Sequence, residues 1–127
     1  MTLVAHGLAE EVKGTGVSIN ALWPATMVES YATINHKLGD RSMWRKASII
    51  SDCCLALVQE KPDFSGHALI DEDYLKSRGV NDLSKYRCDP NVEPPRITAS
   101  AWSGVADGVG TMADVKTRVI SPQRSKL

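Results

Sequence analysis

Two short β-type segments separated by helical sequence constrain the fold of this chain most. Residues 16–22 (GVSINAL) alternate between apolar and polar side chains, which predicts a strand that ends at Trp23-Pro24. Residues 66–71 (GHALID) predict a second, short strand that is buried. Because helical sequence lies between them, the two strands are expected to pair in parallel through a right-handed crossover.

The first helix is predicted over residues 2–13. Thr2 is a candidate cap for its start, and Gly14 is a candidate stop. Apolar residues recur along it at three- and four-residue steps and form one stripe, made of Val4, Ala5, Leu8 and Val12.

The clearest helical pattern covers residues 43–60 and ends before Pro62. Its apolar periodicity predicts a broad buried face that consists of Trp44, Ala47, Ile50, Cys54, Leu57 and Val58. A shorter helix is expected over residues 28–37, with a break at Gly39.

A last short helix is expected to open at Asp71 or Glu72 and to close at Gly79. The acidic run at residues 71–73 has the composition of an acid–base pair, but it is better explained as a helix cap with first-turn charges that suit the helix dipole.

Two parallel strands with so few helices cannot cover both of their faces. The chain is therefore expected to be α/β and to form the C-terminal end of a doubly wound parallel sheet. Residues 1–88 are assigned to this part of a domain. Residues 89–127 contain four prolines and no convincing period, so they are interpreted as a disordered, flexible tail.

Charge and hydropathy argue against two classes of partner. Lysine plus arginine total 15, and aspartate plus glutamate also total 15, so the net charge of zero gives no reason to expect nucleic-acid binding. The apolar stretches are short and interrupted, so no segment is expected to span a bilayer.

Cysteine and histidine residues form no pattern typical of a disulfide framework or a metal site. An odd number of cysteines that includes an adjacent pair favours buried or idle thiols at Cys53, Cys54 and Cys88. The histidines are scattered, without partner carboxylates at a fixed spacing, at His6, His36 and His67.

Three segments resemble the short-chain dehydrogenase/reductase family. Residues 7–11 (GLAEE) match the end of a family helix, and residues 17–24 (VSINALWP) match the strand "V-x-I-N-A-L-x-P" that follows it. Residues 64–72 (FSGHALIDE) are similar to the last core strand of the family. The resemblance covers about residues 1–95 and points to the hydroxysteroid-dehydrogenase-like branch. It implies a partial Rossmann-like fold and, for the whole family, hydride exchange between NAD(P) and a hydroxyl or carbonyl group of a lipid-like substrate.

The catalytic motifs of that family are not found. Members use a tyrosine and a lysine in Y-x-x-x-K, and no tyrosine here has a lysine four residues later. They begin with a T-G-x-x-x-G-x-G turn that binds the cofactor phosphates, and no such turn is identified. The sequence starts just after the position of the family lysine, as a truncated product would. The isolated chain is therefore expected to be inactive and to bind no cofactor alone.

The resemblance carries over three candidate cofactor contacts. The family loop after the strand corresponding to residues 17–22 lies beside the nicotinamide, and here it holds Pro24, Thr26 and Ser30, with Ala25 in place of the usual glycine. The simpler interpretation is that Thr26 and Ser30 cap the helix that follows them.

The last three residues form a second signal. Ser125-Lys126-Leu127 is a tripeptide that a peroxisomal import receptor reads at a free C-terminus, so the protein is expected in the peroxisome.

Two functions remain open. One is a truncated dehydrogenase-type peroxisomal protein. The other is a non-catalytic module that dimerises or joins a full-length relative through the helix at residues 2–13, which the resemblance places at a subunit interface. Cofactor binding by the isolated chain would favour the first function, and stable association with a relative would favour the second.

Overall fold

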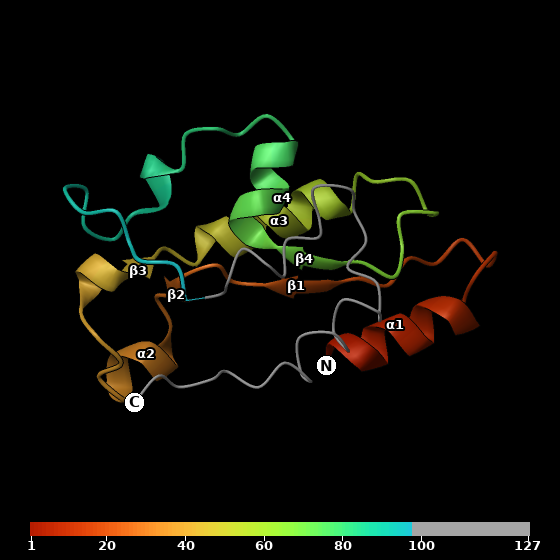
Figure 1. Cartoon of the computed structure of the whole chain (residues 1–127), viewed down its shortest axis with the longest axis horizontal. Helices are drawn as coiled ribbons and strands as arrows, with labels where there is room; N and C mark the ends of the chain where they lie inside the picture. Colours follow the sequence, from red (N-terminus) through yellow and green to blue (C-terminus); the bar gives the residue numbers. More distant parts are fainter. Residues whose placement is uncertain (98–127) are drawn as a thin grey trace, which may run out of the picture.

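The computed structural model describes residues 1–97 (Figure 1). The elements follow one another as α1 (Thr2–Glu11), β1 (Ala21–Trp23), β2 (Met27–Val28), α2 (Tyr31–Asn35), η1 (Arg41–Met43), β3 (Trp44–Arg45), α3 (Ser48–Leu57), β4 (Ala68–Ile70), α4 (Asp71–Ser77) and η2 (Ser84–Tyr86). The terminal tripeptide and most of the predicted tail lie outside the described residues.

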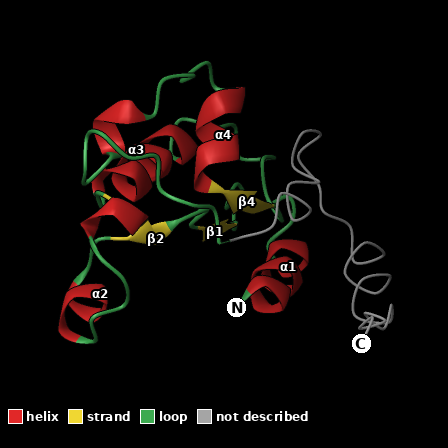
Figure 2. Ribbon diagram, turned by 60° about the vertical axis from the view of Figure 1, so that its left-hand side comes forward, coloured by secondary structure: helices red, strands yellow, loops and turns green. Residues whose placement is uncertain are grey.

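The predicted parallel pair of strands is confirmed. β1 lies beside β4 with Ala21 opposite Ala68 and Trp23 opposite Ile70. A second, two-residue parallel pair joins β2 to β3. In Figures 1 and 2, α3 and α4 lie on one side of β1 and β4, and α1 lies on the other side. This layering confirms the α/β, partial Rossmann-like prediction.

The ladder of β1 is shorter than residues 16–22 because side chains make some of the expected contacts. The Asn20 amide donates to the carbonyl of Phe64 at 2.9 Å, and its oxygen accepts from the amide of His67 at 2.9 Å. The amide of Ile19 donates to the hydroxyl of Ser65 at 2.9 Å. Residues 19–20 therefore run alongside residues 64–67, just before β4, through side-chain bridges and one backbone bond of 2.7 Å from the amide of Gly66 to the carbonyl of Ile19.

The predicted helix at residues 43–60 begins later than expected. Trp44 and Arg45 are not helical, because they pair with β2 as β3, and the helix starts at Ser48. The predicted buried face is confirmed only in part, since Trp44 is buried and Ile50 and Leu57 pack partly buried against the core. Ile49 and Cys53 are the buried positions of α3, whereas Cys54 is exposed and Val58 has 78% of its surface exposed. Apolar residues occur on every side of this helix, so hydropathy alone could not fix which side faces the core.

The predicted cap of α1 is wrong as well. The helix starts after Met1 without a side-chain cap, and the hydroxyl of Thr2 instead accepts a hydrogen bond from the Trp23 indole at 2.8 Å. Two members of the predicted apolar stripe, Val4 and Leu8, are exposed, whereas Ala5 and Val12 are partly buried.

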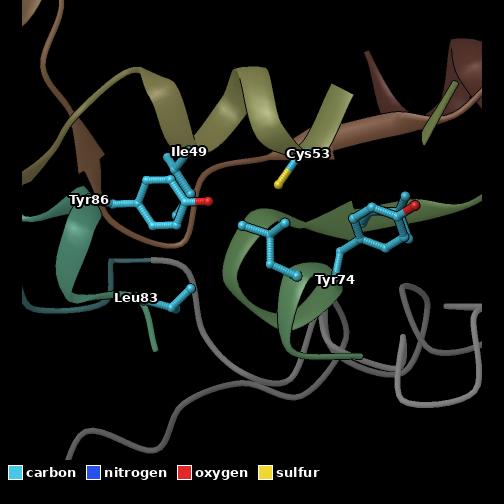
Figure 3. Packing of buried hydrophobic residues seen from close by; sticks show 7 residues of the cluster. Ile49, Cys53, Tyr74, Leu83 and Tyr86 are labelled. Carbon is cyan, nitrogen blue, oxygen red and sulfur yellow. The ribbon is translucent and has the colours of Figure 1, made fainter. Parts of the chain in front are cut away.

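The core lies between α3, α4 and β4. Its buried members are Ile49, Cys53, Leu69, Tyr74, Leu75, Leu83 and Tyr86. Figure 3 shows Ile49 and Cys53 from α3 facing the side chains that rise from α4 and η2. This cluster fixes α4, and with it the end of β4, against α3. Among residues 1–97, no helix is long and apolar enough to cross a bilayer.

Candidate functional site

The carboxyl ends of β1 and β4 meet at one edge of the sheet. Trp23 and Ile70 are in register there, so the loop after β1 and the start of α4 are neighbours. In open parallel sheets, ligands bind outside the carboxyl ends of the strands. We call residues 24–26 the edge loop, since they follow β1 at this position.

Asp71 holds the edge loop to the end of β4. Its Oδ1 accepts from the amide of Ala25 at 2.8 Å and from the amide of Glu72 at 2.7 Å. The side chain is fully buried, and its Oδ2 has no hydrogen-bond partner among the described residues. Burial raises the pKa of Asp71, while the two amide hydrogen bonds oppose that rise. The carboxylate is thus a structural anchor for this edge of the sheet.

The three sequence-derived contact residues have different surroundings. Pro24 and Thr26 lie in the edge loop, and Thr26 is fully buried. Its hydroxyl donates only a long hydrogen bond, of 3.3 Å, to the carbonyl of Met27. Ser30 is the N-cap of α2 and accepts from the amide of Thr33 at 3.2 Å, within a reciprocal capping box. The capping interpretation therefore describes Ser30 but not Thr26.

A buried ion pair next to the edge loop was not foreseen from the sequence. Arg45 of β3 donates from Nε to Glu72 Oε1 at 2.6 Å, and both side chains are almost completely buried. Arg45 also donates from Nη1 to the carbonyl of Leu83 at 3.2 Å. The acidic run does supply first-turn charges of α4, as predicted, but Ile70 is the cap and Glu72 turns inward. The local sequence around Arg45, which directly follows Trp44, contains no signal that Arg45 pairs with Glu72.

Part of the predicted tail is attached to the same edge. Glu93 receives hydrogen bonds from Arg45 and from Arg87 Nε, the latter at 2.6 Å. Arg96 donates two hydrogen bonds of 2.8 Å to the carboxylate of Asp73. The amide of Ile97 donates to the carbonyl of Ala25 at 2.8 Å.

The comparisons with known proteins agree with this geometry. No family model matches the chain. The chain is 34% identical to the hydroxysteroid dehydrogenase-like protein 2 of Danio rerio, over 71% of this chain and 22% of that protein. It is 37% identical to a solved short-chain dehydrogenase of Mycobacterium thermoresistibile, with a TM-score of 0.67 over 76% of this chain and 35% of that one. A solved protein of Xanthomonas campestris, assigned as a dehydrogenase, gives 36% identity and a TM-score of 0.68 over 76% of this chain and 36% of that one.

The chain is a relative of the short-chain dehydrogenases. Both the family resemblance and its hydroxysteroid-dehydrogenase-like branch are confirmed. The chain spans about a fifth of the length of the Danio rerio relative and about a third of each solved dehydrogenase.

The described residues of this short-chain dehydrogenase relative do not fit a dinucleotide by themselves. The Thr26 hydroxyl is enclosed, and the amide of Ala25 is already bonded to Asp71. The glycine spacing of the family turn, without its threonine, does occur once, at Gly104, Gly108 and Gly110. These glycines lie outside the described residues and come after β4 in the chain, so no role is assigned to them.

Two tyrosines of the core have properties opposite to those of a catalytic dehydrogenase tyrosine. Burial raises the pKa of Tyr74 and, together with a hydrogen bond to Asp52, that of Tyr86. Their hydroxyls donate to Glu60 at 2.8 Å and to Asp52 at 2.6 Å. A proton-transfer tyrosine needs a lowered pKa and an open hydroxyl, so these two serve the packing of α3 and α4.

The buried thiol Cys53 and the partly buried His67 belong to the packing of the fold. Burial raises the pKa of Cys53 to about 12, so this thiol stays protonated. His67 stacks on Phe64 with ring centroids 4.1 Å apart, and burial lowers its pKa. Within residues 1–97 no group of three or more His, Cys, Asp or Glu side chains could hold a metal ion.

Proposed function

We propose that this chain supplies the carboxyl edge of a dehydrogenase-type sheet and does not catalyse hydride transfer by itself. The whole-protein reaction would be NAD(P)-dependent oxidoreduction of a hydroxyl or carbonyl group on a lipid-like substrate. The observation that carries the proposal is the hydrogen bond from Ala25 to Asp71, which fixes the edge loop where parallel sheets bind their ligands. The raised pKa values of Tyr74 and Tyr86 support the lack of catalysis.

A turnover assay tests this proposal. The purified 127-residue chain is incubated with NAD⁺ or NADP⁺ and a panel of steroid alcohols and long-chain secondary alcohols, and the absorbance of the reduced nicotinamide is followed. We expect no cofactor reduction above the buffer rate, because no tyrosine in this sequence has a lysine four residues later to form the proton-transfer pair of the family. A full-length short-chain dehydrogenase in the same assay is the positive control. Cofactor reduction that scales with the concentration of the chain would refute the proposal.

The exposed face of α1 favours a second function, as an interaction module. Leu3, Val4 and Leu8 of this helix are exposed. Ala9 is the buried residue of α1. Apolar side chains exposed together on one helix are typical of a protein–protein contact. We propose a second copy or a full-length relative as the partner, and the peroxisome as the location, through Ser125-Lys126-Leu127.

One import experiment tests the module and its location together. The chain is co-expressed with a full-length relative whose own C-terminus is blocked by a fluorescent protein. We expect the chain to reach peroxisomes and to carry the labelled relative with it. Leu8→Glu should leave the chain in peroxisomes but release the relative, because a charge opposes burial of that face.

Two controls separate the parts of this proposal. Lys13→Glu changes an exposed charge just after the end of α1, where Lys13 pairs with Glu10, and should leave import of both proteins unchanged. Deletion of residues 125–127 should leave both proteins in the cytosol. The relative staying in the cytosol while the chain enters peroxisomes would refute the module, and a cytosolic intact chain would refute the address.

A further inference from the structure

Residues 93–97 follow the last 3-10 turn as an irregular segment, yet each end of it is attached to the carboxyl edge. Glu93 is bound by Arg45 of β3 and by Arg87. Arg96 holds both carboxylate oxygens of Asp73 on α4 and lies 3.4 Å from Glu72 Oε2. Pro94, between the two attachments, is buried. Two-point Arg–carboxylate contacts fix orientation as well as distance.

The segment ends on the edge loop. The amide of Ile97 donates to the carbonyl of Ala25 at 2.8 Å, which places residue 97 beside the loop that follows β1. Figure 1 shows this run, in cyan, passing beside β2 and the connection from β1. Ala25 and Thr26 are both fully buried in this arrangement. The backbone of the loop is thus bonded to Asp71 on one side and to residue 97 on the other.

We propose that residues 93–97 form a strap that closes over the edge loop, and that the contact between Arg96 and Asp73 holds the strap closed. In the closed state Thr26 offers no surface to a ligand, so a group approaching this edge requires the strap to open. That the strap controls access of a nicotinamide cofactor rests on the proposed function. The closure of the strap over the edge loop is independent of that function.

The charges around the strap explain why it can open without unfolding the core. Arg96 and Asp73 are partly exposed, with 30% and 23% of their side-chain surfaces accessible, and Glu93 is mostly exposed. Such contacts are weaker than the buried Arg45–Glu72 pair, since water screens them. Opening at Arg96 breaks contacts at the surface and leaves the cluster around Ile49 and Leu69 untouched.

Thiol accessibility at position 26 tests the strap without any cofactor. Thr26→Cys is combined with the native Arg96 or with Arg96→Ala in the full chain, and alkylation is followed residue by residue with mass spectrometry. We expect slow alkylation of the new cysteine when Arg96 is present, and alkylation about tenfold faster or more in Arg96→Ala. The rate follows the fraction of molecules in which the strap is open. The substitution increases that fraction because it removes a charge-assisted, two-point contact with Asp73.

The chain contains its own reference thiols. Cys54 is exposed and reports the unprotected rate, and Cys53 is buried and should stay unreactive if the core is intact. Arg78→Ala is the matched control, because Arg78 also pairs with a carboxylate, that of Glu60, away from the strap. This control should leave the alkylation rate at position 26 unchanged.

Either of two results would overturn the strap. One is alkylation at position 26 as fast as at Cys54 while Arg96 is present. The other is the same slow rate with and without Arg96. If Thr26→Cys prevents folding, the hydrogen exchange rates of the Ile97 and Thr26 amides are measured instead of the alkylation rate. Exchange that is faster in Arg96→Ala but not in Arg78→Ala supports the strap, and exchange that is unchanged in Arg96→Ala refutes it.

Discussion

Replacing Arg45 by methionine is expected to lower the free energy of unfolding by about 3 to 5 kcal/mol. The substitution leaves the Glu72 carboxylate buried, with Arg96 at 3.4 Å as its remaining cation, and it removes the donor to the carbonyl of Leu83. A buried charge that loses its main partner costs more than the lost contact itself. Urea denaturation followed by far-ultraviolet circular dichroism measures the loss.

The paired variant keeps this test informative even if the single variant unfolds. Arg45→Met combined with Glu72→Leu replaces both charges by apolar side chains and should recover most of the lost stability. Arg41→Met is the matched control, since Arg41 pairs with Glu29 at 2.6 Å but is 62% exposed, and it should cost less than about 1 kcal/mol. Equal effects of the Arg45 and Arg41 substitutions would show that the buried pair is not formed.

Replacing Asp71 by alanine is expected to cost about 2 to 4 kcal/mol, because the amides of Ala25 and Glu72 both lose their acceptor at this buried position. Asp71→Asn retains an oxygen that can accept from both amides. Its new amide nitrogen would occupy the site of Oδ2, which has no partner among residues 1–97, so we expect a smaller cost of about 1 kcal/mol. Chemical denaturation of the three proteins at neutral pH gives the order.

The pH dependence of the Asp71→Asn variant has a defined sign. Burial holds the pKa of Asp71 above its ordinary value of 3.8 in the folded chain, so the unfolded chain releases this proton at lower pH than the folded chain does. Ionisation of Asp71 therefore removes stability as the pH rises from about 4 through the raised pKa. The asparagine variant lacks this loss. Its stability relative to the unsubstituted chain should increase over that range, and a decrease would contradict the raised pKa.

The parallel pairing of β1 and β4 could be predicted because each strand carries its signal locally. Alternation before Trp23 and the apolar run before Asp71 are visible in a few residues. The helical crossover between them then leaves parallel pairing as the expected arrangement. The position of the edge loop follows from the same two strands and needs no knowledge of distant contacts.

The errors came from contacts between distant residues. Trp44 and Arg45 fit a helical period, but pairing with β2 makes them a strand. Arg45 and Glu72 are 27 positions apart, and no local pattern indicates that two charged residues bury each other. The attachment of residues 93–97 depends on the same charges, so a proline-rich segment was interpreted as free tail. Helix start, side-chain phase and charge burial were all decided by tertiary packing.

The most direct test of the central claim is the hydrogen exchange rate of the Ala25 amide in the 127-residue chain, measured by nuclear magnetic resonance. If Asp71 fixes the edge loop at the carboxyl ends of β1 and β4, this amide exchanges far more slowly than in an unfolded peptide. It should stay slow in Asp71→Asn and become fast in Asp71→Ala. An Ala25 amide that exchanges as fast in the unsubstituted chain as in an unfolded peptide would mean that no such edge is formed.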